Sequence, residues 1–161
     1  MASARSLVWI ILFLISALAM VILVPRRRIW ELLAFGIVGG LALAMAVQYV
    51  AVVLLKLWSF NYLQIAAWRG IPLFVAGAWM PSVIIFAHFL SYLRSSTGIL
   101  LYVVSFSLVT AGLEYTFVLM GYRNYLNWMF PYTAALAIVL HGILALYILT
   151  FARERRRVRY R

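Results

Sequence analysis

Residues 6–24 read SLVWIILFLISALAMVILV, a stretch without a charged side chain, and Pro25 and a triple arginine end it. An apolar run of 18 or more residues is long enough to cross the roughly 30 Å hydrocarbon core of a bilayer as one helix. Four similar runs follow, and nearly all charged residues lie between the runs. The sequence therefore predicts an all-α, polytopic membrane protein, a bundle of five transmembrane helices at residues 6–24, 29–55, 71–93, 98–121 and 131–151.

Composition excludes several classes of function. The chain has 161 residues, of which 11% are charged, whereas soluble domains carry about 25%. A single transmembrane domain at 1–151 leaves only the basic tail 152–161, so no soluble catalytic or DNA-binding domain fits. The net charge of +11 borders apolar runs, which indicates contact with the bilayer and its anionic lipid headgroups rather than with nucleic acid. The absence of cysteine excludes disulfides and thiolate chemistry.

The distribution of lysine and arginine predicts the orientation. Ten of these residues fall on one side of the predicted spans and four on the other, and the richer side should be cytoplasmic. The N-terminus is then outside, the C-terminus is inside, and the aromatic loops 57–70 and 122–130 lie at the outer headgroups. The arginines expected at the inner headgroups include Arg26, Arg27, Arg28, Arg155, Arg156 and Arg157.

The first span also resembles a secretory signal peptide, because Ala17-Leu18-Ala19 is similar to a cleavage site. Two observations favour a retained span instead. The apolar run continues to Val24, and a signal peptide would send the triple arginine outward and invert the charge bias.

Glu114 is the carboxylate that lies deepest in a predicted span. It is about seven residues, or about 10 Å, from the outer end of that span. A carboxylate at this depth should face the bundle interior, pair with another group or be protonated. Ser107 and Thr110 lie on the same side of the helix at offsets of seven and four, so we expect an intramembrane polar cluster.

The second span offers a partner at a similar depth. Gly36, Gly40, Ala44 and Gln48 recur every four residues, and small residues at this spacing let two helices approach closely. A hydrogen bond between Gln48 and Glu114 is geometrically possible. The competing interpretation is that these residues are only packing and bonding sites between helices.

His141 shares a helix face with Ala137 and Ala145, so it should point into the bundle. Histidines in membrane spans form hydrogen bonds to a neighbouring helix or relay protons. His88 lies in a different span and at a different depth, and no HxxxH or ExxH pair occurs. We therefore expect no metal site and no cofactor. Pro81 interrupts the third span, where it could kink the helix or help to line a transport site.

Four short motifs carry a resemblance to a known family. They are Leu57-Trp58 after the second span, Pro81, Gly112-Leu113-Glu114-Tyr115 in the fourth span, and Gly121 through Tyr125 to Trp128 beyond it. Over roughly residues 30–151 the chain resembles a family of small, uncharacterised five-span membrane proteins of endospore-forming Firmicutes. The resemblance implies a multi-pass protein of the bacterial inner membrane, and it brings no activity. The basic tail and the plain first span depart from the family pattern.

Three functions remain open on the sequence. Since no catalytic motif occurs, the chain is expected to be a non-enzymatic structural, accessory or sensory subunit. It could then act as a homo-oligomer or with a membrane partner protein. The first alternative is a small oligomeric transporter or proton-coupled carrier that uses Glu114, and the second is a lipid-acting intramembrane enzyme.

Overall fold

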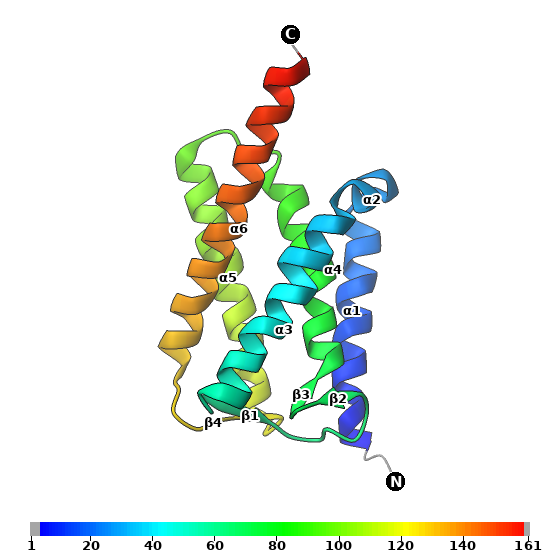
Figure 1. Cartoon of the computed structure of the whole chain (residues 1–161), viewed down its shortest axis with the longest axis vertical. Helices are drawn as coiled ribbons and strands as arrows, with labels where there is room; N and C mark the ends of the chain where they lie inside the picture. Colours follow the sequence, from blue (N-terminus) through cyan, green and yellow to red (C-terminus); the bar gives the residue numbers. More distant parts are fainter. Residues whose placement is uncertain (1–3, 160–161) are drawn as a thin grey trace.

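A bundle of five long helices makes up almost the whole structure (Figure 1). The computed structural model describes the backbone of residues 4–159 and the side chains of residues 4–150. Within these residues, five helices are long and apolar enough to cross a membrane. They begin and end within three residues of the predicted spans. The exception is the last helix, which continues beyond residue 151 to Arg159.

The first two helices are joined by a sharp turn. η1 (Ala4–Ser6) leads into α1 (Leu7–Leu23), and α2 (Arg26–Phe35) follows at once because Pro25 can begin a helix but cannot continue one. α2 is the start of one continuous helix, Arg26–Leu54. Its later parts are η2 (Gly36–Ala42), α3 (Leu43–Gln48) and η3 (Tyr49–Leu54). η2 and η3 have the wide turns of a π-helix, a form that is frequent at functional sites.

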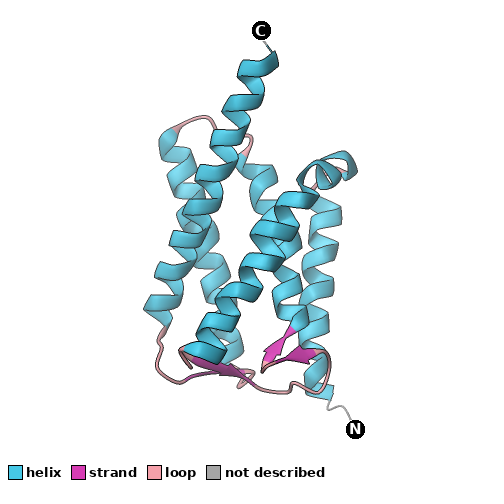
Figure 2. Cartoon of the chain, in the orientation of Figure 1, coloured by secondary structure: helices cyan, strands magenta, loops and turns pink. Residues whose placement is uncertain are grey.

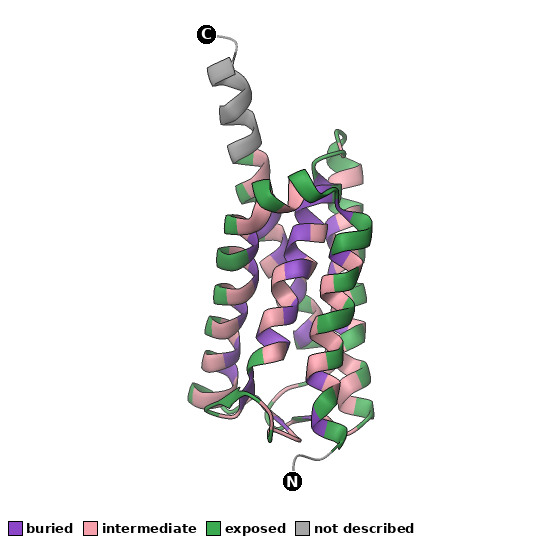
Figure 3. Cartoon of the chain, turned by 90° about the vertical axis from the view of Figure 1, so that its right-hand side faces the viewer, coloured by how far each residue is buried: buried purple, intermediate pink, exposed green. Residues whose placement is uncertain are grey.

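The remaining helices are α4 (Leu73–Leu90), α5 (Ser96–Leu119) and α6 (Phe130–Arg159). Ser95 caps α5 by accepting a hydrogen bond from the Gly98 amide at 3.0 Å. Pro131 occupies the first turn of α6, where its missing N–H costs nothing. α4 lies at the centre of the bundle, with ten of its 18 residues buried, and it contacts α1, η2, α5 and α6. Figure 3 shows this concentration of buried residues on the inner helices.

The four short strands of the described residues lie at one end of the bundle (Figure 2). β1 (Trp58–Phe60) pairs antiparallel with β4 (Arg123–Tyr125), and β2 (Ala67–Trp68) pairs with β3 (Ile71–Pro72). We call this end the loop end. The turns that contain Pro25 and residues 91–95 lie at the opposite end, toward which α6 runs (Figure 1), and we call that the arginine end.

The aromatic loops pack partly into the bundle, a feature that the sequence did not predict. Trp58 and Phe60 are buried under the helices, while the expected position at the outer headgroups stays a prediction. The Asn61 side chain donates to the Gly121 carbonyl at 2.8 Å and accepts from Asn124 at 3.2 Å, so the two loops are bonded to each other. Trp68 stays exposed and stacks on Tyr49. The part of the loops around Trp58 and Phe60 therefore covers one end of the bundle, whereas the part around Trp68 remains at the surface.

Candidate functional site

Glu114 forms an ion pair with Arg123, which comes from β4. α5 ends at Leu119, and Gly121 turns the chain at a φ of +74°, a conformation that favours glycine. β4 then runs back beneath the helices, so the Arg123 side chain reaches upward to the carboxylate. Only 3% of the Arg123 side chain and 22% of the Glu114 side chain are exposed. The deepest carboxylate of the bundle thus has a fixed positive partner.

Aromatic rings hold the guanidinium of Arg123 in place. Its Cζ lies 4.1 Å from the Trp58 ring centroid and 5.6 Å from those of Phe60 and Tyr125. The β1–β4 register causes this arrangement, because it places Phe60 opposite Arg123 and Trp58 opposite Tyr125. A cation over an aromatic face in a desolvated site gains about 2 kcal/mol. The rings therefore offset part of the cost of burying the charge.

Trp58 connects the ion pair to the long helix. Its indole Nε1 donates a 2.9 Å hydrogen bond to Oε1 of Gln48, and both side chains are buried. Although the two line the same cavity, no hydrogen bond joins Gln48 and Glu114 among the described residues. The bond that their similar depth suggested is replaced by two bonds to loop residues. The physical reason is that the folded loop delivers Trp58 and Arg123 into the space between the helices.

A cavity lies beside the ion pair, between the long helix, α4, α5 and α6. We call it the polar cavity; its polar wall consists of Gln48, Thr110, Glu114, Arg123, Thr133 and His141. The volume open to the centres of water molecules is about 60 Å³, and one water needs about 10–15 Å³ by this measure. The polar cavity can therefore hold several waters or one small polar group.

A second cavity of similar size lies on the other side of α4, against α1 and α5. Ser16 and Ser82 contribute to its wall, but their hydroxyls donate to carbonyls of their own helices. Both cavities are lined by Trp79, Thr110, Glu114 and Arg123. The ion pair between Glu114 and Arg123 consequently contributes to the walls of both cavities.

The two ring nitrogens of His141 differ in their hydrogen bonding. Its Nδ1 lies 2.8 Å from the Ala137 carbonyl, which can only accept, so Nδ1 carries the proton. The Ser107 hydroxyl lies 3.2 Å from the same nitrogen. His141 is 1% exposed, and its Nε2 has no hydrogen-bond partner among the described residues. The guanidinium Nε of Arg123 is likewise buried and has no hydrogen-bond partner in the described part of the chain.

Most residues of the predicted polar cluster surround one cavity. Glu114, Gln48, Thr110 and His141 all line the polar cavity. Ser107 is fully buried behind His141 and donates to the Val103 carbonyl at 2.6 Å. The predicted inward orientation of His141 is therefore confirmed.

The small-residue face of the long helix packs against α4. A Cβ added at Gly40 would lie 2.6 Å from the Met80 Cα, and one added at Gly36 would lie 2.6 Å from the Ile84 side chain. Ala44 is buried nearby and lines the polar cavity. The predicted close approach occurs, and its partner is α4, the helix that contains Pro81. α4 continues through Pro81 without a break in its helical assignment.

His88 does not belong to this site. It is buried near the arginine end, with its ring 5.1 Å from those of Phe89 and Tyr92. Within residues 4–150, no group of three or more histidine, cysteine and acidic side chains is placed to hold a metal ion.

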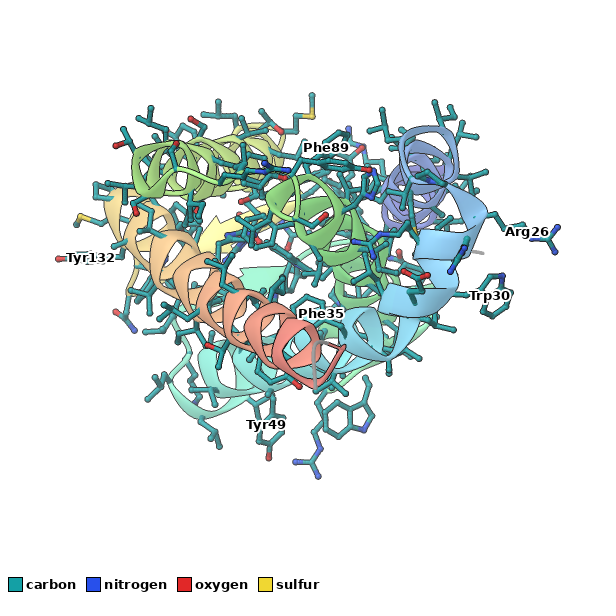
Figure 4. The ribbon with its side chains drawn as sticks, turned by 90° about the horizontal axis from the view of Figure 1, so that it is seen from above. Arg26, Trp30, Phe35, Tyr49, Phe89 and Tyr132 are labelled. Atoms are coloured by element: carbon teal, nitrogen blue, oxygen red, sulfur yellow. The ribbon has the colours of Figure 1, made fainter. Side chains whose placement is uncertain are left out.

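The arginine end differs from the cavity in exposure. Arg27 and Arg28 pair with Glu31 at 3.1 and 2.8 Å, and Arg28 also donates to Ser91 at 3.2 Å. Arg26 points away from the bundle, as does the neighbouring Trp30 (Figure 4). The side chains of Arg155, Arg156 and Arg157 lie outside the described residues.

Sequence reasoning missed three residues of the site. From the sequence, Arg123 is one of the loop charges and Trp58 is expected at the headgroups, while Thr133 carries no signal. Thr133 receives a 2.9 Å hydrogen bond from Trp128 and lies 3.0 Å from the Tyr125 hydroxyl. One signal was available, because Arg123 follows Glu114 by nine residues, just beyond the end of the same span. A lone buried carboxylate and a nearby basic residue suggest such a pair.

Comparisons with protein families, with curated proteins and with solved structures gave no match for this chain. The resemblance to a five-span family therefore stays a prediction.

Proposed function

We propose that this chain is a multi-pass integral protein of the bacterial cell membrane. In this proposal it acts as a non-enzymatic accessory or sensory subunit, with the loop end outside and the arginine end in the cytoplasm. The five apolar helices support insertion, and the exposed arginines at one end support the orientation through attraction to anionic headgroups. The bacterial location follows the resemblance to the five-span family.

The observation that carries the non-enzymatic role is the ion pair between Glu114 and Arg123. A carboxylate that carries protons must alternate between charged and neutral states. Arg123 places a fixed positive charge beside the Glu114 carboxylate, because aromatic rings hold its guanidinium in position. This geometry suits a permanent connection between the loops and the bundle. Such a scaffold can present a surface to a second copy of the chain or to a membrane partner.

A proton-coupled carrier is the second candidate. It is favoured by the two cavities that flank the ion pair and by the polar groups along their walls. A carrier would need the pair to open during its cycle, which would free Glu114 to accept a proton.

One experiment separates the two candidates. The protein and its Glu114→Gln variant are reconstituted into vesicles that enclose a pH-sensitive dye, and proton flux is followed after an imposed pH step. We expect the same slow leak for both proteins and for protein-free vesicles. A flux above the leak that Glu114→Gln abolishes would contradict the proposal and favour the carrier. Ser95→Ala, a change at the far end of α5, is the matched control.

Orientation is tested independently. Single cysteines placed in this cysteine-free chain at Asn127 in the loop end and at Arg94 in the arginine end are labelled with an impermeant maleimide in intact cells. We expect labelling at position 127 and protection at position 94. The reverse pattern would overturn the proposed orientation.

A further inference from the structure

The polar cavity lies next to a groove on the outer side of the bundle. This inner groove lies between α2–η2 and α6, and its volume open to the centres of water molecules is about 590 Å³. Gly39, Leu43 and Leu144 line both hollows. Arg28 and Glu31 contribute to the groove at the arginine end, and the rest of its wall is largely apolar. These residues therefore separate the two hollows, with the Leu144 side chain packed against Gly39, and a ligand could pass where this flexible side chain turns aside.

The inner groove is open along its length. Val38 and Ile143 line it and are 67% and 56% exposed. The stacked rings of Phe35 and Tyr147, 5.7 Å apart, contribute to the same wall. Figure 4 shows Phe35 lying between α6 and the long helix. In a membrane this groove would face lipid, since it is flanked by spanning helices on both sides.

Two residues in the wall of the polar cavity, His141 and Arg123, each have a buried nitrogen without a hydrogen-bond partner among the described residues. His141 Nε2 accepts, because Nδ1 carries the proton, and Arg123 Nε donates. A buried polar atom without a partner is costly, and a bound water or ligand commonly satisfies it. Arg123 and Glu114 neutralise each other, so an added charge would be buried without a counterion. A hydroxyl group fits these conditions because it is neutral and both donates and accepts.

We propose that the polar cavity and the inner groove together bind a membrane-soluble alcohol, a neutral lipid with a long apolar chain and one hydroxyl head. The hydroxyl lies in the polar cavity, where it donates to His141 and reaches Arg123 directly or through a water. The chain passes Gly39, with the Leu144 side chain turned aside, and lies in the inner groove. This proposal rests on the proposed membrane location and gives the accessory or sensory subunit a ligand.

The probe is a hexadecanol analogue that carries a photoreactive diazirine in its chain. It is mixed with the full-length protein in detergent micelles and irradiated, and the labelled peptides are mapped by mass spectrometry. We expect labels on η2 and on the groove-facing part of α6. Unlabelled hexadecanol should compete about tenfold better than hexadecane or hexadecanoate, a factor that one additional hydrogen bond can supply.

Gly39→Leu tests the passage between the two hollows. A Cβ at Gly39 would already lie 2.8 Å from the Leu144 side chain, so a leucine fills the shared wall. We expect labelling by the alcohol to fall about tenfold. Gly112→Leu is the matched control, because no atom lies within 4 Å of a Cβ at that glycine on α5. Labelling should stay unchanged in this control.

His141→Phe tests recognition of the hydroxyl. The new ring can keep the contacts with Phe86 and Phe106 but offers no acceptor. We expect the alcohol to lose its advantage over hexadecane while competition by hexadecane is unchanged. This ratio remains informative if Gly39→Leu does not fold.

Two results would overturn the ligand proposal. Equal competition by hexadecanol and hexadecane would show that no group recognises the hydroxyl, and the cavity would then hold water only. Labelling that is indifferent to Gly39→Leu in a folded variant would show that the chain does not pass this wall. Neither result affects the orientation or flux experiments, so failure of the ligand proposal is distinguishable from failure of the proposed function.

Discussion

At the loop end of the bundle, paired strands and a buried arginine bind the chain to itself, whereas at the arginine end short turns carry exposed charges. Both ends contain an Arg–Glu ion pair. Glu114 and Arg123 are largely shielded from water, while Arg27 is 91% exposed and its partner Glu31 is 38% exposed. The same chemical pair therefore has different consequences. At one end its loss leaves a buried charge, and at the other end water and ions replace the lost partner.

Arg123→Ala should produce the largest effect on stability. Removing the guanidinium leaves the Glu114 carboxylate without its partner in the bundle, and breaking a buried pair costs about 3–5 kcal/mol. We expect a value near 3 kcal/mol, because Glu114 keeps some exposure. The free energy of unfolding in detergent measures it.

The control for this change is Arg69→Ala, which removes an exposed arginine from the same end. Its effect should be much smaller. If Arg69→Ala and Arg123→Ala destabilise equally, the contrast between buried and exposed arginines is wrong. The double variant Arg123→Ala/Glu114→Ala should be less destabilised than the sum of the single variants.

Gly40→Ala should come next. The added methyl group meets the α4 backbone at Met80, and overpacking of this kind costs about 1–3 kcal/mol. Gly142→Ala is the matched change on α6, where no atom lies within 4 Å of the new Cβ. That control should stabilise the helix by up to about 1 kcal/mol. Thermal unfolding of both variants side by side measures the difference, and equal midpoints would count against close contact between η2 and α4.

Trp58→Phe should have an intermediate effect. It keeps an aromatic face for Arg123 but removes the indole N–H that bonds Gln48. We expect a cost of about 1–2 kcal/mol, since a buried acceptor loses its donor. Trp68→Phe, at an exposed ring in the same loop, should cost less. Chemical denaturation of the two variants measures both losses of stability. A larger loss for Trp68→Phe than for Trp58→Phe would refute the stabilising role of the bond between Trp58 and Gln48.

Arg28→Ala should have the smallest effect. Its ion pair with Glu31 and its bond to Ser91 are exposed, and exposed pairs are screened by salt. We expect the unfolding midpoint in 0.15 M salt to stay close to that of the unchanged protein. A loss comparable to that of Arg123→Ala would contradict the comparison between the two ends.

The helices could be predicted from the sequence because each is a long apolar run of the length and polarity that a bilayer-spanning segment requires. The inward face of His141 and the close approach at Gly40 also followed from helical periodicity. The partner of Glu114 did not, because it depends on the path of a loop. Strand pairing and the turn at Gly121 place Arg123 under the bundle, and neither leaves a periodic signal. Hydrophobic patterns reveal which residues are buried, but not which distant loop reaches them.

The length of α6, from Phe130 to Arg159, determines how far its C-terminal end would move if the helix tilted. Its 30 residues span about 45 Å, which exceeds the roughly 30 Å hydrocarbon core. His141 lies in the wall of the polar cavity, and Arg159 is 18 residues, or about 27 Å, further along the same helix. A tilt of 10° about His141, taken as a rough figure, would carry Arg159 sideways by about 5 Å over that length. A small tilt of α6 inside the bundle would therefore produce a larger displacement of its C-terminal end.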